Sequence, residues 1–297
     1  MAKIISLTGD LGSGKSTVSS ILCDRLKYDY IYTGEIQRRI AAKYNMTTTE
    51  LNKYSETHPE IDREIDSTFK SLNDSENLIV DSRLAWFFIP ASFKVFLKTN
   101  LFVSAERIAG DTKRKSESYE SKEDAAYHII ARKTSENKRY GDLYGADCSN
   151  LNNFDMVVDT SFVEPERVAG IILEAYGRRT IPQKGTLSLV SPKNLYPTRS
   201  VGDSCHEECY KNILNNMKDN GYDPAYPVTV VTVDSFDYIL DGHKRTSCAL
   251  KNNIDLIPMI YKDLSTCKES VPKVAGQALF RDWENFHSFK YLIYPVI

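Results

Sequence analysis

The stretch GDLGSGKS at residues 9–16 limits what this chain can fold into more than any other feature. A short apolar run, Ile4–Leu7, precedes it, and a segment with apolar residues at helical spacing follows it. We therefore expect a strand, a glycine-rich turn and a helix in that order. The stretch matches the phosphate-binding pattern G-x-x-x-x-G-K-[S/T] at Gly9, Gly14, Lys15 and Ser16.

Each residue type in this turn has a chemical use. Glycines let backbone N–H groups approach phosphate oxygens closely, and the start of a helix adds partial positive charge. Lys15 is expected to reach the β and γ phosphates, and Ser16 to ligate Mg²⁺. ATP is therefore the expected phosphoryl donor and Mg²⁺ the expected metal. The predicted ATP-binding residues are Gly9, Asp10, Gly12, Ser13, Gly14, Lys15, Ser16 and Thr17.

The segments that follow alternate between strand and helix patterns. NLIVDSRLAWF (77–87) reads as a buried strand that ends in Asp81 and Arg83, and FKVFLKT (93–99) as another strand before a helix. The charged stretch 50–69 is predicted to be helical. This alternation predicts an α/β domain whose parallel sheet is covered by helices on both faces.

Over residues 1–176 the chain resembles the cytidylate kinases, in particular the short archaeal-type P-loop nucleoside monophosphate kinases. The matching segments, in family order, are TGEIQRRIA, HPEIDREID, VDSRLAW, SAERIA, ARKTSENKRYGDLYGAD and FDMVVDTSFVEPERV. The resemblance implies phosphoryl transfer from ATP to CMP or dCMP, with UMP or a modified pyrimidine monophosphate as less favoured acceptors. It implies that the acceptor is bound by Thr33, Gly34, Arg38, Asp81 and Arg83. It also implies that Lys15, Arg83, Arg132 and Arg139 are catalytic, the last two as lid arginines.

Physical chemistry supports arginines in those roles, because a planar guanidinium can bind two oxygens of a transferring phosphoryl group. Arg132 and Arg139 are seven residues apart, so both can project from one helix face. A solvated helix face is the alternative. One departure concerns Ser82, which stands where the family has glycine and is expected to narrow the acceptor pocket. Asp62 and Asp66 are expected either to contact the acceptor base or to face solvent.

The composition changes after residue 178, and TIPQKGT (180–186) has the proline and glycine of a linker. We predict a first domain at 1–178, a linker at 179–186 and a smaller α+β domain at 187–297. In the latter, DGHKR is expected to form a turn before a helix. Backbone amides and cations there would make a second anion site, formed by Asp241, Gly242, His243, Lys244 and Arg245. An ordinary tight turn with exposed basic residues is the alternative.

Residues 188–262 resemble the ParB and sulfiredoxin superfamily, through P-x-x-L-x-P-x-R, then DGHKR, then IPMIY. The resemblance implies a fold that binds nucleotide phosphates at this turn. Sulfiredoxin chemistry needs a cysteine within the turn, whereas Cys248 lies beyond Arg245. A partitioning protein needs a further DNA-binding domain, for which too little chain follows Asp263. Serine-kinase relatives use a glutamate base that NLYPTRS lacks, and Asp203, Glu207 and Glu208 are distant candidates.

Composition excludes several classes of partner. With 38 basic and 40 acidic side chains, the net charge of −2 gives no bulk attraction to nucleic acid or membrane. No apolar run suits a membrane span, and no signal-peptide pattern opens the chain, so a cytoplasmic protein is expected. Six scattered cysteines argue against a disulfide framework, and CHEEC (205–209) lacks a second ligand pair for zinc.

Three interpretations of the whole chain remain. The first is a pyrimidine monophosphate kinase whose second domain binds a nucleotide or another phosphorylated small molecule. The second is a bifunctional protein whose ParB-like domain is a small-molecule, serine-type kinase. The third is a regulator that binds nucleotide, such as CTP, without turnover. The intact lysine and arginine set favours the first over the third, because a pure binder needs no transition-state arginines. The sequence does not indicate an oligomeric state.

Overall fold

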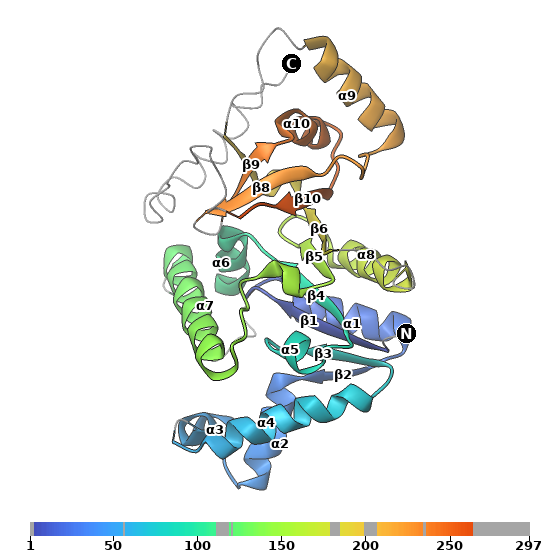
Figure 1. Cartoon of the computed structure of the whole chain (residues 1–297). Coiled ribbons are helices and arrows are strands. Elements are labelled where there is room, and N and C mark those ends of the chain that lie inside the picture. Colours follow the sequence, from blue (N-terminus) through green and yellow to red (C-terminus); the bar gives the residue numbers. More distant parts are fainter. Residues whose placement is uncertain are drawn as a thin grey trace. The chain divides into compact units, whose positions relative to one another are not determined.

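The computed structural model (Figure 1) describes residues 3–55, 57–110, 119, 121–178, 185–198, 207–233 and 236–263. Most of the predicted linker and the aromatic C-terminal stretch lie outside these residues. The chain divides into two compact units by its contacts. The first consists of Met1–Leu97, Ala131–Val157 and Glu164–Thr186, and the second of Lys98–Ile130, Val158–Val163 and Leu187–Ile297. The second unit thus combines segments from both sides of the predicted linker, and the boundaries at 178 and 187 stay a prediction.

The first unit contains a parallel sheet with the strand order β2-β3-β1-β4-β5. Strand β1 pairs in parallel with β3 and β4, and β2 pairs in parallel with β3. All six residues of β1 are buried. Because alternate residues of a strand point to opposite faces, both faces of this sheet are covered. The strands are β1 (Ile4–Gly9), β2 (Asp29–Tyr32), β3 (Leu78–Asp81), β4 (Phe93–Lys98) and β5 (Met156–Asp159).

The helices of this part of the chain follow the expected alternation, with one correction. The stretch 50–69 is not one helix but two, because Pro59 lacks a backbone N–H donor and stands at the start of the second. Helices α1 and α8 pack together, and α5 packs on β1. The helices are α1 (Lys15–Leu26), α2 (Thr33–Lys43), α3 (Thr48–Ser55), α4 (Pro59–Ser71), α5 (Ala85–Phe88), α7 (Lys122–Tyr144), whose first half belongs to the second unit, and α8 (Pro165–Arg178). Short 3₁₀ turns lie at Leu72–Asp74 and Leu151–Asn153.

The second unit contains a mixed sheet with the order β6-β10-β8-β9-β7. Strands β8 and β9 form an antiparallel hairpin, while β10 runs parallel to β8 and β7 parallel to β9. As expected, a helix follows the strand end at DGHKR, although it already begins at His243. The elements are α6 (Leu101–Ala109), β6 (Leu187–Val190), a 3₁₀ turn (Pro192–Asn194), β7 (Leu195–Pro197), α9 (Glu207–Asn220), β8 (Val228–Val233), β9 (Phe236–Asp241), α10 (His243–Lys251) and β10 (Ile257–Tyr261).

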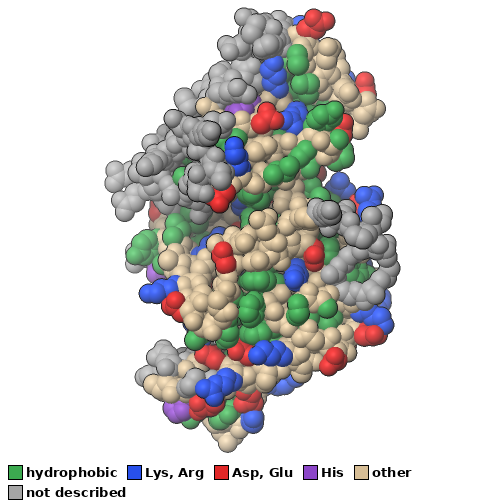
Figure 2. All heavy atoms as spheres, in the orientation of Figure 1, with side chains coloured by type: hydrophobic (Ala, Val, Ile, Leu, Met, Phe, Trp, Pro, Cys, Tyr) green, Lys and Arg blue, Asp and Glu red, His purple; other side chains and the backbone are tan. Residues whose placement is uncertain are grey.

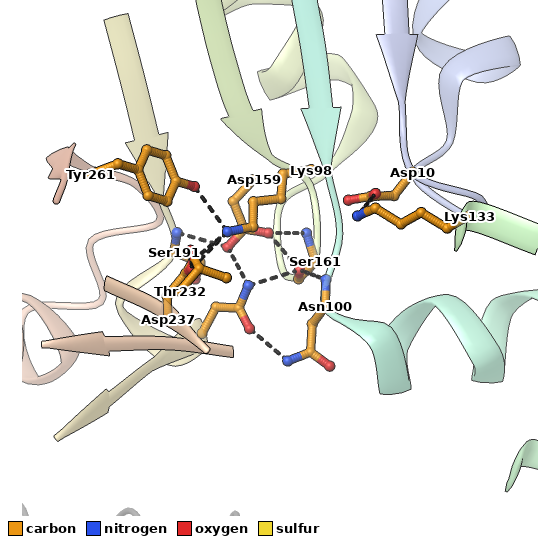
Figure 3. Close-up of polar contacts among 11 residues, drawn as sticks. Asp10, Lys98, Asn100, Lys133, Asp159, Ser161, Ser191, Thr232, Asp237 and Tyr261 are labelled. Carbon is orange, nitrogen blue, oxygen red and sulfur yellow. Dashed lines mark hydrogen bonds and ion pairs between the residues drawn. The ribbon is translucent and has the colours of Figure 1, made fainter. Parts of the chain in front are cut away.

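A buried ion pair lies within the second unit (Figure 3). Lys98, the last residue of β4, donates to both carboxylate oxygens of Asp237 on β9, at 2.7 and 2.6 Å. The same ammonium donates to the Tyr261 hydroxyl at 2.9 Å, and the Thr232 hydroxyl donates to Asp237 at 2.7 Å. Strand β9 is thereby joined to the end of β4 by charge-assisted hydrogen bonds, which are the strong ones in protein interiors.

A second buried group of polar residues centres on Asp159, at the end of β5. Its carboxylate accepts from the backbone N–H of Ser161 at 2.9 Å, the backbone N–H of Ser191 at 3.0 Å and the side-chain amide of Asn194 at 3.0 Å. Asn100 donates its side-chain amide to Asn194 at 2.7 Å. Burial raises the pKa of Asp159, and these hydrogen bonds oppose that shift because they stabilise the carboxylate.

Candidate active site

The glycine-rich loop has the predicted strand–turn–helix geometry. Strand β1 ends at Gly9, α1 begins at Lys15, and the turn between them has Gly12 and Gly14 at φ of 72° and 79°. A side chain would be strained at either of these two positions. Gly9 is required for a different reason, because a Cβ there would lie 2.4 Å from the carbonyl oxygen of Leu97 on β4. The Ser13 hydroxyl is buried in the turn and makes no hydrogen bond with the described residues, so it is available as a donor.

Lys15 lies in the first turn of α1, with its ammonium 3.3 Å from the carbonyl oxygen of Gly9. Burial lowers the pKa of Lys15. The nearby carboxylates of Asp81, Asp10 and Glu136 oppose that shift, whereas the Arg83 guanidinium adds to it. The lysine thus lies in a field to which at least four charged side chains contribute.

Asp81 is the last residue of β3 and is held by an aromatic neighbour. The hydroxyl of Tyr30 on β2 donates to its carboxylate at 3.1 Å. Burial raises the pKa of Asp81, while Lys15, the tyrosine hydroxyl and Arg83 lower it. The structure therefore brings the two predicted residues Lys15 and Asp81 into electrostatic contact.

Arg83 and Arg132 come from distant parts of the sequence and share one carboxylate. Arg83 donates Nη1 to the carbonyl oxygen of Gly9 at 2.7 Å, and its Nε lies 3.0 Å from Oε2 of Glu136. Arg132 donates Nε to the other oxygen of Glu136, Oε1, at 2.8 Å. Helix α7 is thus tied to the segment after β3, and two of the three arginines predicted to be catalytic bind the same carboxylate.

Two further cations on α7 are paired with carboxylates. Lys133 donates to Asp10 in the loop at 2.9 Å (Figure 3). Arg139 donates through Nη2 to both oxygens of Asp62 on α4, at 3.1 and 3.0 Å. Asp66, one turn further along α4, accepts from the hydroxyl of Tyr144 at 3.2 Å. Asp62 and Asp66 therefore bind side chains of α7.

The predicted acceptor-binding segment lies at the start of α2. Thr33 and Gly34 are its first two residues, while Arg38 lies over the ring of Tyr32 with its guanidinium carbon 5.1 Å from the ring centroid and donates to the tyrosine hydroxyl. Ser82 is buried, and its hydroxyl accepts from the backbone N–H of Leu84 at 3.3 Å. That hydroxyl is therefore bonded to the turn after β3.

Sequence reasoning missed Lys133 and Glu136. In RKTSENKR both look like ordinary charges of a solvated helix, and Glu136 lies four residues after Arg132, the spacing of a common surface ion pair. The available signal was that same spacing, since Glu136 must lie on the face that carries both predicted lid arginines.

The second predicted anion site lies where β9 meets α10. Gly242 has φ of 103° and immediately precedes α10, and a Cβ at this residue would lie 2.7 Å from Val228. His243 is buried, and its Nε2 accepts from the backbone N–H of Thr198 at 3.2 Å. Lys244 is half-buried.

Arg245 has a structural role at this turn. Its guanidinium donates to the carbonyl oxygen of Tyr226, to that of Pro227 at 2.9 Å and to the Asp241 carboxylate at 2.6 Å. The structure thus places Arg245 across the end of the hairpin, where its guanidinium binds groups of the protein itself.

Among the described residues, the side chains and helices show neither a metal-binding cluster nor a membrane-spanning helix. No cluster of three or more His, Cys, Asp or Glu side chains suits a metal ion there, and Cys205 and His206 lie outside that part of the chain. None of the described helices combines the length and apolar character that a bilayer crossing requires. On the face drawn in Figure 2, Lys and Arg side chains are interspersed with Asp and Glu side chains.

Residues 4–162 match the family model described as "Cytidylate kinase-like family". Cytidylate kinase from Sulfolobus acidocaldarius is 37% identical over 180 residues, which are 60% of this chain and 96% of that protein. Cytidylate kinase from Pyrococcus abyssi is 36% identical over 173 residues, 58% of this chain and 92% of that protein.

A third relative has a different name. The S-adenosylmethionine-dependent nucleotide dehydratase from Lacinutrix mariniflava is 34% identical over 182 residues, which are 61% of this chain and 37% of the dehydratase. These comparisons concern about the first 60% of the chain, where the loop and the arginines lie.

Proposed function

Because this chain belongs to the cytidylate kinase-like family and is a nucleoside monophosphate kinase, we propose that it transfers the terminal phosphoryl group of ATP to CMP or dCMP. The observation that carries the proposal is the pair of guanidinium groups, Arg83 and Arg132, held by one carboxylate beside the loop. Phosphoryl transfer needs positioning and positive charge around the equatorial oxygens more than covalent chemistry. We propose the cytoplasm as the location of this reaction.

We assign the following roles in substrate binding and catalysis. Backbone amides of the loop and Lys15 bind the phosphates of ATP. Arg83 binds the acceptor phosphate, and Arg132 stabilises the charge on the transferring group. Arg139 and Arg38 lie on α7 and α2, where they would border the acceptor.

The residues beside the loop fit Mg²⁺, which is held by oxygen ligands and substrate phosphates. Ser16 is exposed in the first turn of α1, and the carboxylate of Asp81 is within electrostatic range of its neighbour Lys15. Ser16 would hold the metal, with Asp81 as a carboxylate partner. When bound, Mg²⁺ would neutralise part of the negative charge of the ATP phosphates.

The test uses the full chain with ATP, Mg²⁺ and each nucleoside monophosphate in turn, and quantifies the diphosphates. We expect CDP and dCDP to form fastest. Lys15→Met should lower the rate at least a hundredfold, whereas Lys27→Met, at the far end of the same helix, should change it less than twofold. Turnover of purine monophosphates alone, or of no monophosphate, would contradict the proposed acceptor.

For the C-terminal part we propose a ParB/sulfiredoxin-like module that binds a nucleotide or other phosphorylated small molecule. The start of α10, with Gly242 before it and Lys244 in its first turn, supports this, because the first backbone amides of a helix favour an anion. Alternatives are a serine-type small-molecule kinase and a CTP-responsive regulator.

Calorimetric titration of the full chain with CTP, CDP, ATP and ADP tests this module. Lys244→Gln should remove one binding step while leaving monophosphate turnover unchanged. Exposed Lys211→Gln on α9 serves as the control for loss of one positive charge. If Lys244→Gln alters no binding step, this proposal is wrong.

A further inference from the structure

Glu136 contacts the two arginines in the way a phosphate would. Its two oxygens point to different guanidinium groups, Oε2 to Nε of Arg83 at 3.0 Å and Oε1 to Nε of Arg132 at 2.8 Å. The carboxylate is one-fifth exposed, and Arg83 about one-quarter. Both bonds have the length of charge-assisted hydrogen bonds. A phosphate oxygen that is to be bound by both arginines must therefore compete with this carboxylate.

The surroundings show that Glu136 faces the loop. Arg83, which it binds, also donates to the carbonyl oxygen of Gly9. The negative charge of Glu136 acts on Lys15 as well, since it is among the carboxylates that raise the pKa of that lysine. Glu136 thus lies within electrostatic reach of the groups that the proposed function assigns to phosphate binding.

We propose that Glu136 is an internal competitor for phosphate, a positioning residue that holds Arg83 and Arg132 together and is displaced from them when a phosphate group binds both. The inference rests on the proposed function for the identity of the incoming phosphate. It goes beyond that function because it assigns to the Glu136 carboxylate the place that a phosphate group takes when a ligand is bound. A carboxylate can bridge two guanidinium groups through separate oxygens, as a phosphate does, but it carries less charge and forms fewer hydrogen bonds.

The test compares the wild-type full chain with Glu136→Gln by calorimetric titration with inorganic tripolyphosphate and with CMP. The substituted amide has a similar shape to the carboxylate but no negative charge, so bound phosphate should be favoured. We expect the Kd of each to fall roughly tenfold, equivalent to about 1.4 kcal/mol. In steady state, KM should fall while kcat also falls, because the arginines are no longer held together. Glu123→Gln, an exposed residue in the first turn of α7, makes the same charge change and should alter Kd less than twofold.

A second variant separates competition for Arg83 from a general charge effect. Without Arg83, the substitution of Glu136 should no longer tighten binding. The double variant Arg83→Gln, Glu136→Gln should therefore have the same Kd as Arg83→Gln alone. An unchanged or higher Kd in Glu136→Gln, with an unchanged melting temperature, would overturn the inference, as would a gain that persists without Arg83. If tripolyphosphate binds more tightly to Glu136→Gln but no monophosphate is phosphorylated, the acceptor assignment fails and the competition stands.

Discussion

Replacing Asp237 with alanine should destabilise the protein strongly, because it leaves a buried ammonium without its counter-ion. The side chains of Lys98 and Asp237 are 11% and 1% exposed. Asp237 accepts two hydrogen bonds from Lys98 and one from Thr232, so its removal takes away three at once. Breaking a buried pair by deleting one partner costs about 3–5 kcal/mol.

That loss corresponds to a fall in melting temperature on the order of 10 °C, because each kcal/mol lowers it by about 2–4 °C in a chain of 150–250 residues. Differential scanning calorimetry of the full chain measures the shift. Asp255→Ala, an exposed carboxylate between α10 and β10, should change the melting temperature by no more than about 2 °C.

A double variant tests the cause. Lys98→Met together with Asp237→Leu removes both charges and fills similar volume, so it should recover most of the lost stability. A loss below about 1 kcal/mol in Asp237→Ala, or a double variant no more stable than the single one, would refute the argument that the uncompensated charge causes the loss.

Three further outcomes are expected. A chain that ends at residue 178 lacks the partners of Lys98 and Asp159, so it should melt far below the full chain in calorimetry; an equal melting temperature would contradict this. As the pH rises, the rate of phosphoryl transfer should begin to fall before the pH reaches 10.5, the ordinary pKa of a lysine. Burial lowers the pKa of Lys15, and the neutral amine binds phosphate less well. Lys15→Arg, however active, should lack that alkaline limb. Gly242→Ala should lower the free energy of unfolding, measured with urea, by about 2 kcal/mol. Gly221→Ala should lower it less, because Gly221 also has a positive φ but a Cβ there would meet nothing within 4 Å.

The loop was predictable because its signal is local. A strand, a glycine-rich turn and a helix start follow one another in sequence, and the chemistry of each residue in the turn depends on its immediate neighbours. The two positive φ values at Gly12 and Gly14 agree with that expectation. The break between α3 and α4 was also encoded locally, by Pro59, but the charged pattern around it suggested one continuous helix.

The ion pairs were not predictable in the same way, because their partners are distant in sequence. Glu136 binds Arg83, 53 residues before it, and Asp237 binds Lys98, 139 residues away. In FDY, Asp237 looks like a polar residue at the solvent face of a strand, whereas the structure buries it. Only the arrangement of strands decides whether such a carboxylate meets solvent or a lysine.

Four cations of the site are paired with carboxylates of the protein, and this pairing affects which ligands the site binds. Lys133 is paired with Asp10, Arg139 with Asp62, and Arg83 and Arg132 share Glu136. A small anion that binds one of these cations must displace the carboxylate already bound to it, so the net gain in binding free energy is small. A ligand that presents phosphate oxygens to Arg83 and Arg132 together replaces one carboxylate with a more highly charged group, and gains from both. Internal pairing should therefore favour ligands in the geometry that phosphoryl transfer requires over small anions of similar charge.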